Sequence, residues 1–420
     1  MALRGSKSSG KRSRDGGSAK RSSREWIARG GLALGLAVLS YIGTASSLAH
    51  VVVKADPAQA HLMAPDNGVI LADYAQTSFT RRPVKEANSA PANLAREALL
   101  AEPTAADALT VLGFQAQLRG DTAQADRIFS YSTAISRREL RPRLWAIEES
   151  IARGDIAGAL RNYDIALRTS NDALGLLFPS LTAALAEPRI RAALLPVLDS
   201  DPVWKDSFLG YIAKTGIEPE GAIALFREGR AIGLEASEDA QANLVNALFG
   251  QNKRSEAWAY YRTFRSGARR DLSRDPNFAL NTAVKSVFDW QTGTDTRLSA
   301  AILQQGNRGI LDFSVPPSVG GALVSQAQLL PPGPYRLEGQ SRGIDQPERS
   351  RPYWSLTCQD GRELGRIVLP NSDQDSGRFT GRFDVPAGCV SQTLTLVARS
   401  TDDIMGVSGQ IEKARLIPLS

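Results

Sequence analysis

Residues 30–53 form a run without a formally charged side chain, and this run constrains the fold more than any other feature of the chain. At 1.5 Å of rise per residue, roughly 20 apolar residues are needed for a helix to cross a bilayer. The run is long enough, and Trp26 precedes it at the position of an interfacial aromatic residue. The sequence therefore predicts one transmembrane helix between a short N-terminal tail and the bulk of the chain.

The tail, residues 1–29, carries nine Lys and Arg side chains against two acidic ones, although the net charge of all 420 residues is only +6. Positively charged flanks stay in the cytoplasm. We therefore expect a single-pass protein of a bacterial inner membrane, with a cytoplasmic N-terminus and its bulk in the periplasm. The tail is rich in Ser and Gly and lacks stacking aromatic residues before Trp26, which predicts a disordered segment with no nucleic-acid role.

A cleaved signal peptide is the alternative to a retained anchor. Ser47-Leu48-Ala49 has the small-x-small pattern of a cleavage site. The long basic region and the continuation of the apolar run through residues 51–53 favour the retained transmembrane anchor. Export of everything that follows is expected in both cases.

Composition divides the exported part into three segments. Residues 54–90 hold scattered Pro, Ala and polar residues, which predicts a linker. Residues 91–280 are rich in Ala and Leu at helical spacing, and residues 281–420 are rich in Gly, Pro and alternating apolar residues. We expect a multidomain chain that combines an all-α domain with an all-β domain.

A repeat with a period of 34 residues occurs in the helical segment. Gly120-Asp121, Ala125 and Phe129 recur as Gly154-Asp155, Ala159 and Tyr163. This period resembles that of the tetratricopeptide repeat, a pair of antiparallel helices with a turn between them. The resemblance covers about residues 105–170. It implies an α-solenoid whose concave face binds partner proteins, here proteins of the envelope or of polysaccharide assembly.

The same resemblance implies which side chains of the first helices face that groove. They are Asp107, Thr110, Phe114, Gln117, Arg141, Leu144, Glu148 and Ile151. For each of them, plain exposure to solvent is the alternative.

Five segments of residues 281–420 alternate apolar and polar side chains with period two. They are residues 322–325, 334–339, 353–358, 379–385 and 393–398. Turn clusters such as Pro331-Pro332-Gly333 separate them, which predicts an antiparallel β-sandwich. The alternation places Tyr335, Leu337, Trp354, Leu356, Cys358, Phe379, Phe383, Leu394 and Leu396 inside. It places Arg336, Glu338, Tyr353, Arg378, Arg382 and Asp384 outside.

These strands resemble the jelly-roll sandwiches of carbohydrate-binding modules. Phe288-Asp289-Trp290 is similar to the start of C-terminal domains that accompany tetratricopeptide repeats in exported proteins of exopolysaccharide systems. The resemblance implies that the sandwich contacts polysaccharide through an exposed aromatic ring. Tyr353 and Trp290 are the candidate glycan-binding residues, with a place in the core as the alternative for each.

Cys358 and Cys389 are the two cysteines of the chain. Export favours a disulfide between them. Two buried free thiols are the alternative. Without nearby His, the pair does not match a zinc site.

The sequence offers little catalytic chemistry. His occurs only at positions 50 and 61, outside the two predicted domains, and neither a Walker loop nor a dinucleotide-binding fingerprint is present. We therefore expect no cofactor and no metal, and a non-enzymatic, periplasm-facing scaffold. Because paired carboxylates cannot be recognised from sequence, a polysaccharide-modifying hydrolase or lyase using acidic residues is the alternative.

Overall fold

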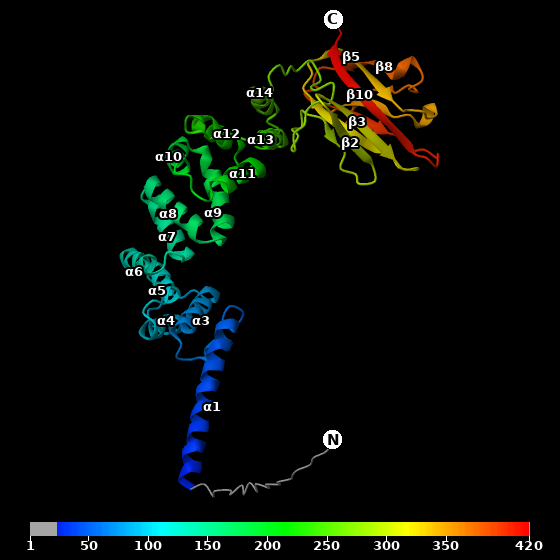
Figure 1. The fold of residues 1–420 in the computed structure, drawn as a ribbon. Helices are drawn as coiled ribbons and strands as arrows, with labels where there is room; N and C mark the ends of the chain where they lie inside the picture. Colours follow the sequence, from blue (N-terminus) through cyan, green and yellow to red (C-terminus); the bar gives the residue numbers. More distant parts are fainter. Residues whose placement is uncertain (1–22, 420) are drawn as a thin grey trace, which may run out of the picture. The chain divides into compact units, whose positions relative to one another are not determined.

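The computed structural model describes residues 23–419, without the side chains of residues 23–25 and 375. Most of the predicted basic tail therefore lies outside the described residues. The chain forms two compact units, residues 1–153 and 154–420. Figure 1 shows helices up to the end of α14 and strands after it, as the change in composition predicts.

The described part of the first unit is helical. Its helix α1 (Ser23–Val52) contains the predicted span, and over Trp26–Val52 it is the one described helix that is long and apolar enough to cross a membrane. A signal sequence near an N-terminus meets the same criterion. The others are α2 (Pro57–Met63), α3 (Gly68–Arg81), α4 (Ala90–Ala101), α5 (Ala106–Leu118), α6 (Thr122–Ile135) and α7 (Leu140–Ala152).

The segment 54–90 differs from the predicted linker, since α2 and α3 lie within it. The side chains of Asp56 and Asn67 accept hydrogen bonds from the first backbone N–H groups of these helices and cap them. Leu71, Ala75 and Phe79, each four residues apart, pack against side chains from α4 and α5. The sequence did not predict α3 because few large apolar residues mark its buried side. One of the buried positions is Ala75, and Pro and polar residues surround the segment, so the helical spacing of these apolar residues does not stand out.

The 34-residue repeat is a repeat of helices. Helices α5 and α7 begin at residues 106 and 140, and α6 and α8 (Ile156–Thr169) begin at residues 122 and 156. Gly120 and Gly154 have φ values of +82° and +71°, which favour glycine. Asp121 and Asp155 then cap α6 and α8 by accepting from the backbone N–H of Gln124 at 3.0 Å and of Gly158 at 2.8 Å. The predicted 34-residue period is therefore a period of helix starts, and α5 and α6 pack against each other as one helical pair.

The second unit joins the remaining helices to a two-sheet sandwich. The helices are α8, α9 (Asp172–Ala183), α10 (Pro188–Asp199), α11 (Lys205–Thr215), α12 (Pro219–Glu228), α13 (Glu238–Gly250) and α14 (Arg254–Phe264). Short 3-10 helices cover Ala184–Ala186, Gly229–Ile232, Glu348–Ser350 and Asp375–Gly377.

The sandwich has two antiparallel five-stranded sheets, in the orders β1-β4-β9-β6-β7 and β2-β3-β10-β5-β8. The strands are β1 (Gln291–Thr292), β2 (Ser299–Gln305), β3 (Arg308–Val315), β4 (Gly321–Gln328), β5 (Gly333–Arg342), β6 (Tyr353–Cys358), β7 (Glu363–Val368), β8 (Arg378–Val385), β9 (Gln392–Ala398) and β10 (Val407–Pro418). All nine side chains predicted to point inward are buried. A disulfide joins Cys358 to Cys389, with 5.7 Å between their Cα atoms, as export predicts.

Phe288-Asp289-Trp290 joins the last helices to the sandwich. Phe288 packs against Trp258 and Tyr261 of α14. Asp289 accepts from the hydroxyl of Tyr261 at 2.8 Å. Trp290 enters the sandwich core, where its ring centroid lies 5.6 Å from that of Trp354.

The burial of Trp290 corrects its assignment as a glycan-binding candidate. Its side chain is 2% exposed, and its indole N–H donates to the carbonyl of Asp275 at 2.8 Å. The ring therefore offers no face to a ligand. Phe288-Asp289-Trp290 lies where the chain passes from the helices into the sandwich. Packing against both parts therefore explains this motif without a ligand.

Candidate functional site

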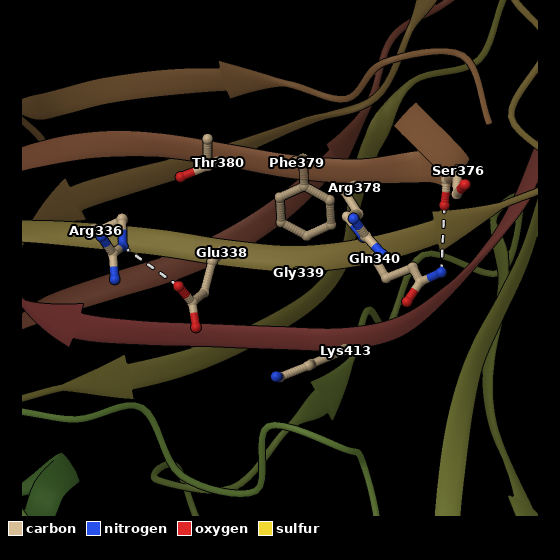
Figure 2. Close-up of a pocket in the computed structure, with 9 residues that line it drawn as sticks. All are labelled: Arg336, Glu338, Gly339, Gln340, Ser376, Arg378, Phe379, Thr380 and Lys413. Atoms are coloured by element: carbon tan, nitrogen blue, oxygen red, sulfur yellow. Dashed lines mark hydrogen bonds and ion pairs between the residues drawn. The ribbon is translucent and has the colours of Figure 1, made fainter. Parts of the chain in front are cut away.

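A hollow of about 850 Å³ lies on the outer face of the second sheet, where β8, β5 and β10 run side by side (Figure 2). Strand pairing sets its side chains in rows across the three strands. Gln340 of β5 lies between Arg378 of β8 and Lys413 of β10. In the next row Glu338 lies between Thr380 and Arg415. Directly opposed side chains in a sheet lie within contact of one another, so each row can meet one ligand.

Positive charge dominates this surface. Glu338 forms an ion pair with Arg336 at 3.3 Å (Figure 2). It also forms one with Arg415 at 3.8 Å. Arg378 and Lys413 are exposed, and neither forms an ion pair with any carboxylate whose side chain is described.

The fold holds the end of the hollow in place. Gln340 donates from Nε2 to the carbonyl of Ser376 at 3.2 Å (Figure 2). The hydroxyl of Ser341 donates to the carbonyl of Gly377 at 3.1 Å. Gly377 has a φ of +71°, and a Cβ there would lie 2.0 Å from the carbonyl oxygen of Ser341. The turn before β8 is thereby fixed to β5.

Sequence reasoning placed Arg336, Glu338 and Arg378 on the outer face but missed Gln340 and Lys413 as members of a site. The strand β10 was not predicted, because a β-bulge between Ile411 and Lys413 breaks its alternation. The outward polar residues of β5 and β8 were the available signal, and only the pairing with β10 turns them into one surface.

Tyr353, the other glycan-binding candidate, lies on the outer face of the first sheet and is half-buried. The guanidinium groups of Arg366 and Arg399 each lie 4.8 Å from the centroid of its ring. Strand pairing places Arg366 on β7 and Arg399 beyond β9, on the two sides of Tyr353. A sugar could stack on this ring only by displacing an arginine.

The eight side chains predicted to face the helical groove separate into two groups. Thr110 is buried and donates to the carbonyl of Ala106, so it belongs to the interior rather than to the groove, whereas Phe114 is partly buried, with its ring centroid 5.0 Å from that of Phe129. The reason is that α5 contacts α3, α4 and α6 and is covered on most sides. The remaining six are exposed or partly exposed: Asp107, Gln117, Arg141, Leu144, Glu148 and Ile151.

Asp107 belongs to an acidic cluster with Asp73 of α3 and Glu139, beside Arg141. Burial and the adjacent carboxyl of Asp107 raise the pKa of Asp73 to about 6. Burial and Asp107 also raise the pKa of Glu139. Nowhere in residues 23–419 are three His, Cys, Asp or Glu side chains arranged to hold a metal ion.

Substituting Asp73 by Asn is expected to stabilise the protein at pH 7.5 by about 1 kcal/mol, because the change removes an unfavourable negative charge. A carboxyl whose pKa rises on folding from 3.8 to about 6 binds more protons when folded, so stability falls as pH rises through that window. Solvent screens part of the effect because Asp73 is only half-buried. Chemical denaturation of the full chain in detergent at pH 4, 6 and 7.5 measures it.

The gain from Asp73→Asn should shrink towards pH 4. Asp126→Asn, at an exposed position of α6, is the matched control and should leave the pH profile unchanged. An equal gain at all three pH values would contradict the charge repulsion between Asp73 and Asp107.

Comparison with protein-family models gives no match, and neither does comparison with curated proteins. Among solved structures, the galactotriose complex of TmCBM61 is similar to the chain at 15% identity, covering 36% of this chain and all of that one, with a TM-score of 0.25. PilF of Pseudomonas aeruginosa is similar at 17% identity over 47% of this chain and 77% of that one, with a TM-score of 0.24.

The enzymatically active domain of tailspike protein 4 from bacteriophage CBA120 is similar at 15% identity over 32% of this chain, with a TM-score of 0.22. The chain covers only 20% of that protein's length. Likenesses with TM-scores of this size give no information about ligands.

Proposed function

We propose that this chain is a non-enzymatic, membrane-anchored adaptor of the cell envelope, in which the sandwich holds a glycan chain and the helical region binds partner proteins. The observation that carries the proposal is the hollow over β8, β5 and β10. Its rows combine hydrogen-bond donors, an amide, a hydroxyl and a carboxylate on one rigid surface. A glycan presents hydroxyl groups that both donate and accept, so it matches this mixed set.

The hollow supports binding better than turnover. Glycoside hydrolysis by acidic residues needs two carboxyl groups on opposite sides of the scissile bond. Among its described lining residues, Glu338 is the one carboxylate, and two arginines engage it. A hydrolase or lyase is therefore the less supported alternative.

The end of α1 supports a retained anchor. Ala49 and Val53 are buried in a cluster with Ala60 of α2 and Ile70 of α3. Helix α1 continues through the small-x-small pattern at residues 47–49 without interruption. Cleavage there would remove part of the packing of the first unit, so we propose a single-pass inner-membrane protein with a cytoplasmic N-terminus.

The helical face of the first unit is proposed to bind the partner proteins. Exposed Ile151 and partly exposed Leu144 lie on α7 with the charged side chains of Arg141 and Glu148. Apolar side chains surrounded by charges are typical of a protein-binding surface. The class of partner proposed is a protein of envelope or polysaccharide assembly.

Filling the hollow is expected to abolish glycan binding. In Thr380→Trp, the indole would occupy the space beside Glu338 and exclude a chain from the rows. The full chain, held in detergent, is applied to an array of bacterial polysaccharides, and bound protein is measured with and without the substitution. We expect at least a tenfold loss of signal, since about 1.4 kcal/mol of lost contact has that effect.

The matched control is Thr393→Trp, the same change at an exposed threonine on the other sheet, which should bind like the unaltered chain. Equal loss in both variants would place the glycan elsewhere. Absence of signal from the unaltered chain on every polysaccharide would refute the glycan-binding part of the proposal.

A further inference from the structure

The charges around the hollow select among glycans. Among the side chains that the structure describes, five cations lie in the hollow or beside it on β5, β8 and β10, namely Arg336, Arg378, Arg382, Lys413 and Arg415, against the carboxylates of Glu338 and Asp384. Asp384 is already paired with Arg382 at 2.7 Å. The excess positive charge therefore lies in the row Arg378–Gln340–Lys413, whose two cations have no ion pair with described carboxylates.

The register of β5 and β8 is a second feature that decides where an anionic ligand can bind. Arg336 of β5 lies directly opposite Arg382 of β8 in the register of the two strands. Like charges directly opposite each other in a sheet destabilise it. Glu338 and Asp384 each pair with one of these two arginines, so the excess positive charge of β5 and β8 stays at Arg378, where an anionic ligand can meet it.

The lining excludes two other classes of anionic ligand. Phe379 is the one aromatic side chain of the lining, and at 5% exposure it offers no ring on which nucleobases could stack. The remaining lining side chains are charged or polar, so there is no apolar contact for lipid chains. What the surface offers is a fork of guanidinium donors, an ammonium group, an amide and a hydroxyl.

We propose that the hollow binds an acidic polysaccharide, a glycan whose sugar residues carry carboxylates. Arg378 meets one carboxylate with two parallel N–H groups, and Lys413 meets a second as a point charge. Neighbouring strands are about 4.8 Å apart, so the bases of these two side chains lie about 10 Å from each other across Gln340. Gln340, Thr380 and Glu338 then bond hydroxyl groups between the two carboxylates. This inference rests on the proposed glycan-binding function and adds the ligand class.

Polygalacturonate and its fully methyl-esterified form test the inference, because the two share a backbone and differ in the charge of the carboxyl groups. Binding of each to the full chain in detergent is measured by calorimetry at low and at high salt. We expect polygalacturonate to bind at least about 10-fold more tightly than its ester, with an affinity that falls as salt rises.

The variant Arg378→Gln/Lys413→Gln should lose this preference, with affinity for polygalacturonate falling by about 10-fold or more. Arg189→Gln/Lys214→Gln, which removes one exposed arginine and one exposed lysine from the helices of the same unit, is the control for net charge and should bind normally. An equal loss of affinity in both variants would contradict binding by the row Arg378–Gln340–Lys413.

The outcomes separate this inference from the proposed function. Equal binding of acid and ester, abolished by Thr380→Trp, would overturn the acidic ligand and leave glycan binding in place. Equal binding of polyphosphate, or of phosphatidylglycerol vesicles, would show a general anion surface and overturn the inference. Binding of no polysaccharide would overturn both.

Discussion

Replacing Arg274 with methionine is expected to lower the free energy of unfolding of the second unit by about 3 to 5 kcal/mol. The side chain is 7% exposed and lies between the last helices and the sandwich. Burial lowers the pKa of its guanidinium to about 10, so it stays charged at neutral pH. Methionine has a similar volume but none of the donors.

The loss is large because Arg274 satisfies several buried acceptors at once. Its guanidinium donates to the carbonyls of Phe288 and Leu272 at 3.1 and 3.2 Å, to Gln328 Oε1 at 2.7 Å, and to the carbonyl of Ala327. It also lies over the rings of Trp258 and Phe288, 5.5 and 5.6 Å from their centroids. Without it, buried carbonyls on both sides of the joint lack partners, and each such group costs about 1 to 3 kcal/mol.

Urea denaturation of the full chain in detergent, followed by tryptophan fluorescence, measures the effect, since Trp258 and Trp290 lie at the joint. Arg297→Met is the matched control, because Arg297 is exposed and, among the described residues, its side chain bonds only to the partly exposed Asp295. Its substitution should cost less than about 1 kcal/mol. A similar small cost at Arg274 would show that the helices and the sandwich do not depend on this joint.

The parts of the fold that depend on short-range periodicity were predictable from sequence. Alternation placed Tyr335 and Leu337 inside and Arg336 outside, and the structure confirms all three positions. The recurrence of Gly-Asp at residues 120 and 154 predicted the helical turns, because glycine readily adopts the left-handed conformation at the turn and aspartate caps the helix that follows.

The site depends on long-range pairing, and this was not predictable. Gln340 and Lys413 are 73 positions apart in the sequence and become neighbours only through the pairing of β5 with β10. Gln340 and Lys413 were missed, whereas Trp290 was proposed and then excluded. Its local motif suggested a ligand contact, but tertiary packing buries the ring in the sandwich core. A single sequence shows which side chains leave a strand on the solvent side, but it does not show which strands lie next to each other.

Breaking the disulfide between Cys358 and Cys389 is expected to lower the free energy of unfolding of the sandwich by about 3 to 4 kcal/mol in the chain-entropy model. The two residues are separated by 31 positions, and the loop they close contains β7 and β8. Its second strand carries Arg378 and Thr380, so the crosslink also limits unfolding of one wall of the hollow. Unfolding of the full chain in urea, with and without dithiothreitol, measures the effect.

The double variant Cys358→Ala/Cys389→Ala separates the crosslink from the packing of the cysteine side chains. If the crosslink carries the effect, the variant should match the reduced protein and be insensitive to dithiothreitol, because the chain has no other cysteine. Equal stability of the oxidised and reduced chains would contradict the prediction.

The two cysteines also report on which side of the membrane the sandwich lies, since disulfides persist outside the reducing cytoplasm. Thiols that resist alkylation in cells until a reductant is added would support the proposed periplasmic sandwich, and thiols alkylated without reductant would refute it.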